Sequence, residues 1–319
     1  MYTESAAHKL LFEPAIAGAD QLCILTAHAT PGMASWLLKS YDERGIAGIS
    51  IQLIIGTVVE EGISTLFHEG FKELHGKYYS NRSGKFVCSY IYKNFPMREN
   101  LYLWLKSGKP ILAFSGDFEF TQSSILQEQN KDIIEQNPEE ADRIFESAVN
   151  CSVYCNYSEI EEDIRIYRSD IVINCRTASD ADTADKVDLS LLTRRGDETG
   201  KRSGLNWGQR GGKNKNETYI PLPSKIAKSG FFPLNRQHFI VLTDDHCALL
   251  LRVEQQNDKA ITTPASNAQL GEYFRKRLGL PNGAYVRKED LLKYGRTNVS
   301  FYKIDDEQFY MDFSAEGNG

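Results

Sequence analysis

The chain has 319 residues, a formal net charge of −6 and a hydrophobic fraction of 41%. This length favours two domains, and the hydrophobic fraction is sufficient for packed cores, so a globular protein is expected. No stretch approaches about 18 consecutive apolar residues, and the first residues lack the regions of a signal peptide. We therefore expect a cytoplasmic protein without membrane contact.

In the N-terminal part, strand patterns alternate with helical patterns. Apolar runs predict strands at 21–28, 49–57, 85–93, 101–107, 110–118 and 151–155. Helical patterns occupy 31–44, 62–76 and the acidic stretch 130–149. A tight Ser107-Gly108 turn joins two strands into a hairpin. This order predicts an α/β domain over residues 1–176, with helices on the faces of a sheet. The polar segment 177–186 is predicted to be a linker.

Residues 187–319 follow a different pattern, with short strands separated by turn residues. The predicted strands lie at 187–192, 217–223, 238–245, 247–253, 259–264 and 299–304. Helices are predicted at 271–279 and from about Arg287. Many short strands with little helix indicate a mainly β, barrel-like domain.

The charge is distributed unevenly between these two parts. Residues 187–319 contain 20 Lys and Arg against 16 Asp and Glu, a net of +4. Residues 1–186 contain 17 against 27, a net of −10. Because a basic region attracts polyanions, any contact with DNA is predicted in the second part.

The stretch 203–220, SGLNWGQRGGKNKNETYI, combines glycines with an aromatic residue, amides and cations. Such a mixture packs poorly into a core but suits a loop that grips DNA. Arg and Lys neutralise phosphates, and Asn, Gln and Arg can pair with base edges. The alternative is a solvated surface loop without a ligand.

The cysteines do not indicate a metal site. Cys151 and Cys155 form a CxxxC pair, but no second pair or histidine cluster completes a zinc site. We interpret the six cysteines as reduced thiols.

Several polar residues in the N-terminal part could carry chemistry. His28 follows the first buried strand, at the edge of the sheet where α/β proteins place their sites. Glu99, Asp117 and Glu119 could form a carboxylate cluster for Mg²⁺. His75 and Lys77 form an HxK sequence, which a basic helix terminus also explains.

The C-terminal pattern of SGLNWGQR, ETYIPLP, LGEYFRKRLGL and YGRTNVSFYKIDDEQFYMDFS resembles the DNA-recognition domain of NgoFVII-type restriction endonucleases. The resemblance covers about residues 187–314 and implies a B3-like pseudobarrel with two arms that enter the major groove of double-stranded DNA. By position the arms are 195–216 and 262–277. Within these arms the candidates for base edges are Asn206, Gln209, Arg210, Thr263, Ser266, Asn267 and Gln269, and the candidates for phosphate or secondary contacts are Lys213, Lys215, Asn216, Arg275 and Lys276. Trp207 could support the loop or contact a base or sugar, and Arg195 completes the predicted DNA-binding set.

The N-terminal part resembles the phospholipase-D-like nuclease domain of the same family, through FPMRENLYLW and AFSGDFEFTQ. That superfamily uses a histidine nucleophile, with a lysine and an asparagine that stabilise the oxyanion, and needs no metal. Here Arg98, Asn100 and Glu119 stand at those three positions. Arginine stays protonated and cannot act as the nucleophile, and glutamate repels a phosphate.

Three functions therefore remain open. The first is a homodimeric restriction endonuclease with no cofactor. The second is a non-catalytic, sequence-specific DNA-binding subunit of a restriction or defence complex. The third is a nuclease with a replaced site that uses carboxylates and Mg²⁺. Relatives of this type also suggest a methyltransferase or ATPase subunit as a partner. The candidate catalytic residues are Arg98, Asn100, Asp117, Glu119 and His28.

Overall fold

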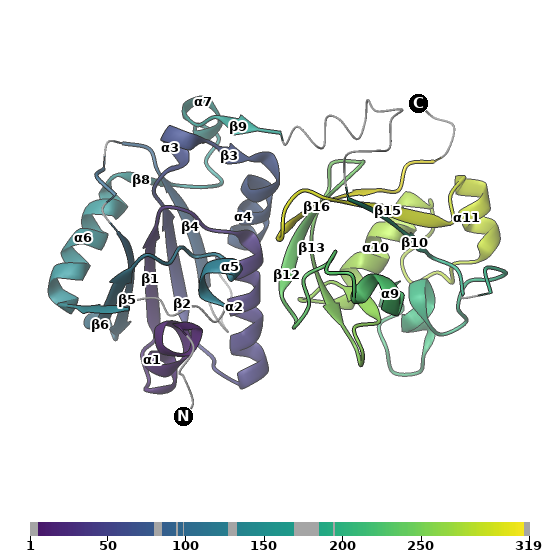
Figure 1. Ribbon diagram of the computed structural model, residues 1–319, viewed down its shortest axis with the longest axis horizontal. Helices are drawn as coiled ribbons and strands as arrows, with labels where there is room; N and C mark the ends of the chain where they lie inside the picture. The colour runs from purple at the N-terminus through teal and green to yellow at the C-terminus, as the bar shows by residue number, and fades with distance from the viewer. Residues whose placement is uncertain are drawn as a thin grey trace. The chain divides into compact units, whose positions relative to one another are not determined.

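The computed structural model describes residues 6–79, 85–93, 95–97, 99–126, 133–168, 185–193 and 195–315. The chain divides into two compact units, Met1–Arg168 and Ser169–Gly319 (Figure 1). Each unit has its own sheet and its own core.

The N-terminal unit is built on a seven-stranded mixed sheet in the order β7-β6-β5-β1-β2-β4-β8. Its strands are β1 (Gln21–Thr26), β2 (Ser50–Ile55), β4 (Lys85–Ile91), β5 (Asn100–Lys106), β6 (Lys109–Gly116), β7 (Ile134–Gln136) and β8 (Ser152–Tyr154), and a separate pair is formed by β3 (Ile63–Ser64) and β9 (Ile166–Tyr167). Strand β1 is parallel to β2 and antiparallel to β5, and β5 is antiparallel to β6. The carboxyl ends of β1 and β6 therefore meet the first residue of β5 at one edge of the sheet.

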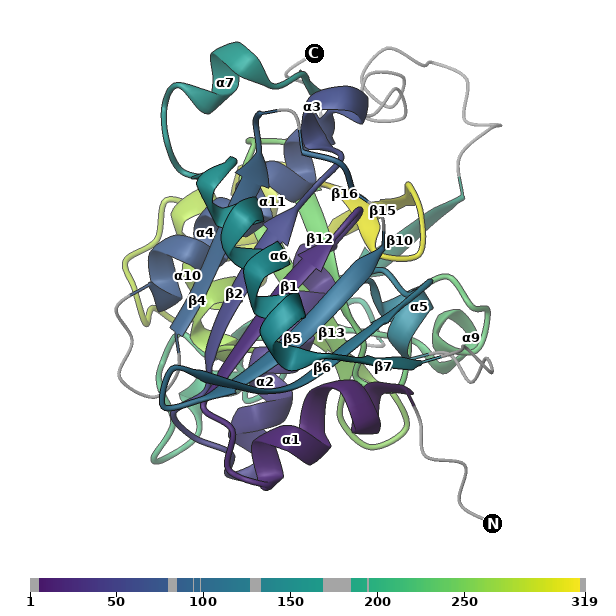
Figure 2. The same ribbon diagram turned by 90° about the vertical axis from the view of Figure 1, so that its left-hand side faces the viewer.

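Helices cover both faces of this sheet. They are η1 (His8–Phe12), α1 (Glu13–Ile16), α2 (Pro31–Arg44), α3 (Val58–Glu61), α4 (Thr65–Tyr78), α5 (Gln122–Ile125), α6 (Pro138–Asn150) and α7 (Ile160–Asp163). Helix α6 lies across one face, where Phe145 packs with Leu25 and Leu103 (Figure 2). Helices α2 and α4 lie on the opposite side (Figure 1). Helix α2 begins where the Thr30 hydroxyl accepts a hydrogen bond from the Met33 N–H at 3.1 Å, as an N-cap does.

The C-terminal unit folds as a nearly closed barrel. Its sheet has the order β10-β15-β16-β12-β13-β14-β11, and β12 and β16 are its one parallel pair among the described strands. The strands are β10 (Lys186–Ser190), β11 (Ile220–Pro221), β12 (His238–Thr243), β13 (Ala248–Glu254), β14 (Ala260–Thr262), β15 (Asn298–Lys303) and β16 (Gln308–Asp312). The helices are η2 (Gly204–Gln209), α9 (Ser224–Ala227), α10 (Asn267–Arg277) and α11 (Lys288–Tyr294). The two end strands β10 and β11 contact each other, which nearly closes the sheet.

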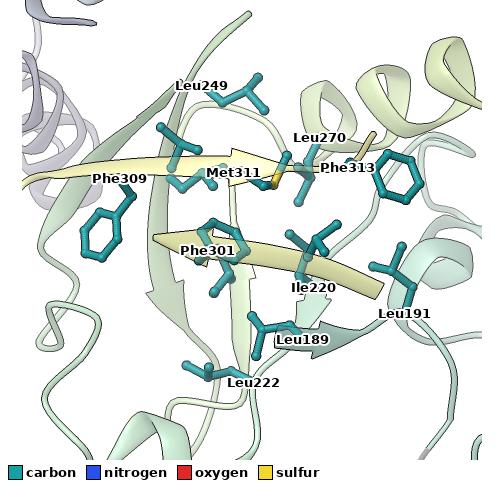
Figure 3. Close-up of a cluster of buried hydrophobic side chains, with 14 of the residues drawn as sticks. Leu189, Leu191, Ile220, Leu222, Leu249, Leu270, Phe301, Phe309, Met311 and Phe313 are labelled. Atoms are coloured by element: carbon teal, nitrogen blue, oxygen red, sulfur yellow. The ribbon is translucent and has the colours of Figure 1, made fainter. Parts of the chain in front are cut away.

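Apolar side chains from all around the sheet fill this barrel. Figure 3 shows Phe301, Phe309 and Met311 beside residues of β10, β11, β13 and α10. All three are fully buried, and each such side chain contributes about 1.5–3 kcal/mol through burial. The barrel is therefore a rigid base for the loops that leave it.

The structure confirms the alternating N-terminal elements and the short C-terminal strands. The Ser107-Gly108 turn has positive φ at both residues, 51° and 74°, as a tight hairpin requires. The prediction missed η1, α1, α3, α5, α7, α9 and η2, and the strands β3, β7, β9 and β16. The second predicted helix begins at Thr65 instead of residue 62. Most of the predicted linker, 177–184, lies outside the described residues, and its last residue Lys186 belongs to β10.

Candidate nucleic-acid interface and candidate active site

The first arm turns around the short helix η2, which carries Trp207. The Arg210 guanidinium lies over the Trp207 ring, 3.7 Å from its centre, and its Nε donates to the Arg202 backbone oxygen at 3.0 Å. The Tyr219 ring packs edge-on against the Trp207 ring, with 5.4 Å between the two ring centres. Stacking and one hydrogen bond thus orient an exposed guanidinium and leave its two terminal amino groups without a hydrogen bond among the described residues.

Asn206 has a different position from that expected. Its side chain is fully buried, and its Oδ1 accepts from the Val286 N–H at 2.9 Å. Its Nδ2 donates to the Val286 and Gly200 backbone oxygens at 2.8 and 3.1 Å. Asn206 therefore fixes the loop from inside the domain and is not at a base edge in this structure.

Arg275 joins the two arms. It is fully buried, and its guanidinium donates to the backbone oxygens of Leu205, Lys215, Gly271 and Ala284 at 2.8–3.2 Å. Burial lowers the pKa of Arg275, but these acceptors satisfy its donors. The expectation that Arg275 contacts phosphates is corrected, because its guanidinium is buried and donates to backbone oxygens within the domain.

Asn216 and Gln209 add to the same framework. The Asn216 Oδ1 accepts from the Gly283 N–H at 2.6 Å, and its Nδ2 donates to Glu272 Oε1 at 3.3 Å. Gln209 Nε2 donates to the Gly283 backbone oxygen at 3.0 Å. Asn216 is buried and Gln209 is half-buried, so both act first within the protein.

The second arm leads into α10 through a capping turn. Thr263 is buried and donates to the Ser266 backbone oxygen at 2.5 Å, while the Ser266 hydroxyl caps the helix by accepting from the Ala268 N–H at 3.3 Å. The Asn267 backbone oxygen accepts from the Thr218 N–H at 3.0 Å, which ties this arm to the first. The side chains of Asn267 and Gln269 are half-buried, and that of Ser266 is exposed.

Exposed cations of the arms surround this framework: Arg195, Lys201, Arg202, Arg210, Lys213, Lys215 and Lys276. Arg195 and Lys201 line an open groove of about 900 Å³ with Tyr285, whose exposed fraction is 38%. Lys201 and Tyr285 are additions to the predicted set. The basic character of residues 201–215 indicates Lys201, whereas nothing in the sequence distinguishes Tyr285 from a core tyrosine.

In the N-terminal unit, Asn100 begins β5 and is buried. Its Oδ1 accepts from the Thr26 hydroxyl at 2.8 Å and the Ala27 N–H at 3.0 Å, and its Nδ2 donates to the Gly116 backbone oxygen at 3.2 Å. Asn100 thus fastens the ends of β1 and β6 together. In this arrangement its amide holds the edge of the sheet and is not exposed to a substrate.

His28, just beyond β1, lies between two carboxylates. Its Nδ1 is 2.6 Å from Glu119 Oε1, and its Nε2 is 2.6 Å from Glu61 Oε2. Partial desolvation lowers the pKa of His28, but the hydrogen bonds and charges of Glu61 and Glu119 outweigh this effect and raise the pKa above its ordinary value. Sequence reasoning missed Glu61, because the four-residue helix α3 that carries it is too short to show a period.

The expected carboxylate cluster for Mg²⁺ is not assembled. Asp117 and Glu119 lie after the end of β6, where strand alternation no longer places them on one side. Glu119 contacts His28, and Glu99 instead lines a cavity of about 540 Å³ beside α6. Among the described residues, no group of three or more His, Cys, Asp or Glu could hold a metal ion. Arg98 lies outside the residues that the structure describes.

The HxK sequence at His75 is part of the core. His75 is buried in α4, its Nδ1 accepts from the Cys88 N–H at 3.2 Å, and its ring stacks on Tyr79. It packs against β4 and is not accessible to a substrate. His75 and Lys77 both lie in the last turn of α4, so the alternative, a basic helix terminus, is confirmed. Lys77 lies over the ring of Tyr78 on the same helix.

Comparison with known families follows the two-unit division. A model of the NgoFVII restriction endonuclease N-terminal PLD domain matches residues 5–162. A model of the NgoFVII C-terminal B3-like DNA-binding domain matches residues 180–305. No protein of curated function matches the chain. In the part of the chain that the structure describes, no helix is both long and apolar enough to cross a membrane. Together the two family matches cover most of the chain, which therefore belongs to the NgoFVII restriction endonuclease family.

Proposed function

We propose that this protein recognises a specific sequence in double-stranded DNA with the two arms of its C-terminal unit, and that its N-terminal unit hydrolyses phosphodiester bonds in that DNA. The DNA-binding domain family and the restriction endonuclease family both support this function. The chemistry of the two units supplies the rest of the argument.

The single observation that supports DNA recognition is that the arms contain two kinds of polar side chain, buried ones that fix the loops and exposed ones that can contact DNA. Buried polar groups, chiefly Asn206 and Arg275, satisfy backbone groups and fix the loops. Exposed groups such as Arg210 and Lys215 keep donors available at the surface. Rigid loops with oriented donors lose little entropy on binding, which favours sequence recognition over a flexible basic tail.

Arg210 is the strongest candidate for a contact to a base. Its stacking on Trp207 and its bond to the Arg202 oxygen orient the guanidinium before DNA arrives. A guanidinium held in this way can donate two parallel hydrogen bonds to the N7 and O6 of guanine. Arg195, Lys201, Lys215 and Lys276 suit phosphates, which position the protein without carrying sequence information.

Hydrolysis is proposed at the edge where β1 and β6 end. At this edge His28 contacts both Glu61 and Glu119. Asp117, two residues before Glu119 in the sequence, is exposed. A histidine with two carboxylate partners can transfer protons, and such chemistry needs no metal ligand from the protein.

A second candidate function is DNA binding without cleavage, and a specific observation favours it. The Asn100 amide is used inside the sheet edge, and Glu119 brings a negative charge to a place where a phosphodiester must come. In this case the N-terminal unit would serve dimerisation or docking to a partner subunit, such as a methyltransferase or an ATPase.

One experiment separates the two candidates. Random-sequence DNA is selected on the purified protein, and plasmids with and without the enriched site are incubated with EDTA or with Mg²⁺. The proposed function predicts enrichment of one site and cleavage in EDTA. Enrichment without cleavage in either buffer supports the binding subunit, and no enrichment rejects sequence recognition. Cleavage only with Mg²⁺ rejects the metal-free site. Light scattering during size-exclusion chromatography tests the proposed homodimer.

A further inference from the structure

The backbone around His28 is fixed from three sides. The Thr26 hydroxyl shares its one hydrogen between Asn100 Oδ1 and the His28 backbone oxygen, which lies 2.9 Å away, and the Phe120 N–H donates to the same His28 oxygen at 3.1 Å. The oxygen of the preceding Ala27 accepts from the Thr57 hydroxyl at 2.9 Å. These bonds connect the ends of β1, β2 and β6, so the imidazole extends from a rigid base, as a catalytic side chain requires.

Both ring nitrogens of His28 face carboxylate oxygens at 2.6 Å. An ionised carboxylate only accepts hydrogen bonds, so when both carboxylates are ionised both ring nitrogens donate and the ring is an imidazolium. A protonated ring has no free lone pair and cannot attack phosphorus. The same ring is a proton donor, and it is exposed, with 46% of its side chain accessible to solvent.

Resting on the proposed hydrolysis, we propose that His28 is the general acid of that reaction, that Glu119 is its positioning residue, and that Glu61 occupies the place of a phosphodiester oxygen until DNA binds. Glu61 ends the short helix α3, and 56% of its side chain is exposed, so it can leave Nε2 without opening the core. The phosphodiester group carries the same net charge as the carboxylate that it replaces. Exchange of one for the other therefore keeps the charge around Nε2 unchanged.

Glu119 has the other role because its carboxylate binds Nδ1, on the side of the ring away from Nε2. Its backbone N–H donates to the Ser124 hydroxyl at 3.1 Å, which fixes the turn that follows β6. With Nδ1 held, the Nε2–H keeps one direction.

In the proposed step, the oxygen of a water molecule forms a bond to phosphorus, and the bond from phosphorus to the leaving sugar oxygen breaks. The leaving oxygen takes the proton from His28 Nε2 and departs as a hydroxyl. The water oxygen stays on phosphorus as part of a phosphate monoester, and its surplus proton passes to solvent. Neutral His28 then takes a proton from solvent and returns to Glu61.

The test compares cleavage of site-containing DNA by the full-length wild type and by H28N, E119Q and E61Q. H28N is expected to lower kcat about 100-fold or more and to leave DNA binding intact, because general acid catalysis contributes about 100- to 10,000-fold. H246N is the matched control, since His246 is an exposed histidine at positive φ, where asparagine is tolerated. It is expected to cleave as the wild type does.

The pH profiles distinguish catalysis from a structural role. A general acid is active while protonated, so activity should fall as the pH rises through the pKa of His28, which its two carboxylate partners raise above its ordinary value. E119Q removes a partner that remains in the substrate complex, so the alkaline limbs of both kcat and kcat/KM should move to lower pH. E61Q removes a partner that DNA displaces, so the limb of kcat/KM alone should move.

Each outcome decides the assignment. Undiminished cleavage by H28N would overturn the role of His28 while leaving the proposed hydrolysis intact. A protein–DNA adduct that survives denaturation at alkaline pH would show a nucleophile in place of an acid. Absence of cleavage by the wild type in both EDTA and Mg²⁺ would reject hydrolysis itself, and the acid role with it, but not DNA recognition.

Discussion

The two arms and the sheet edge where β1 and β6 end are both held by a buried asparagine, but the exposed charges around the two asparagines have opposite signs. In each place a buried asparagine holds neighbouring backbone segments, Asn206 in the first arm and Asn100 at the start of β5. Around Asn206 the exposed side chains include several cations, whereas around Asn100 they include Glu61 and Glu119 with one histidine between them. The arms are therefore ready for a polyanion, and the edge must first release a carboxylate.

The comparison also separates support from contact. A polar side chain in a loop does not by itself indicate a contact with a ligand. In both regions the buried amide acts on the protein, and the groups outside it act on the ligand. Substitutions of the first kind should change stability, and those of the second kind should change binding or catalysis.

The largest effect is expected where the two arms touch. A Cβ added at Gly271 would lie 1.7 Å from the Asn216 backbone oxygen and 2.7 Å from the Thr218 hydroxyl. G271A should therefore destabilise the C-terminal unit by about 3 kcal/mol, measured by denaturant unfolding, and should weaken binding to all DNA sequences.

The matched control is G211A, because an added Cβ at Gly211 meets nothing within 4 Å. If G271A proved as stable as G211A, the close contact between the arms would be wrong. Helix propensity works against the expected result, since alanine is favoured over glycine within α10 by about 1 kcal/mol.

The paired asparagines give the next largest effect. N206A and N100A each leave backbone groups buried without partners, at about 1–3 kcal/mol for each change. N206A should also lose DNA affinity, whereas N100A should lose cleavage and keep DNA affinity. Unfolding curves and binding isotherms measured on both variants test this, with N282A as an exposed control in the loop before Val286. Equal loss of DNA affinity in both would end the distinction between the two regions.

Substitution of Arg210 tests a residue that is proposed to contact DNA without stabilising the fold. R210A should weaken binding to the selected site by about 1–3 kcal/mol and should leave the unfolding free energy nearly unchanged. Binding to random DNA is the internal control, and an equal loss there would exclude a role in base recognition. R210K should not restore the preference, because a lysine lacks the planar fork that stacks on Trp207.

The sequence allowed most of the strands to be predicted, because apolar periodicity is local. The run His238–Thr243 is buried throughout and could be recognised without any knowledge of its neighbours. The roles of Asn206 and Arg275 were beyond the sequence, because their partners are backbone groups of distant segments, such as those of Val286 and Leu205. Composition indicated the right loops but not which polar side chains turn inward.

The β1–β6 edge, where the active site is proposed, was partly predictable for the same reason. His28 could be chosen from its position after a buried strand. Glu119 could be chosen from the family motif, but its contact with His28 could not, because it lies in an irregular turn after β6. Glu61 was missed altogether, because it comes from a short helix. Contacts between such elements depend on the tertiary fold, which local patterns do not specify.

The smallest effect concerns the lysines of the first arm, which differ only in their partners. Lys213 pairs with Glu217 at 3.2 Å, whereas the Lys215 ammonium has no ion pair among the described residues. K215Q should weaken binding equally on all sequences and reduce the slope of log Kd against log salt by about 0.9, the value for one released counterion. K213Q should change the slope less, because Lys213 must give up Glu217 before it neutralises a phosphate. Equal slopes for the two variants would mean that the Lys213–Glu217 pair does not persist when DNA binds.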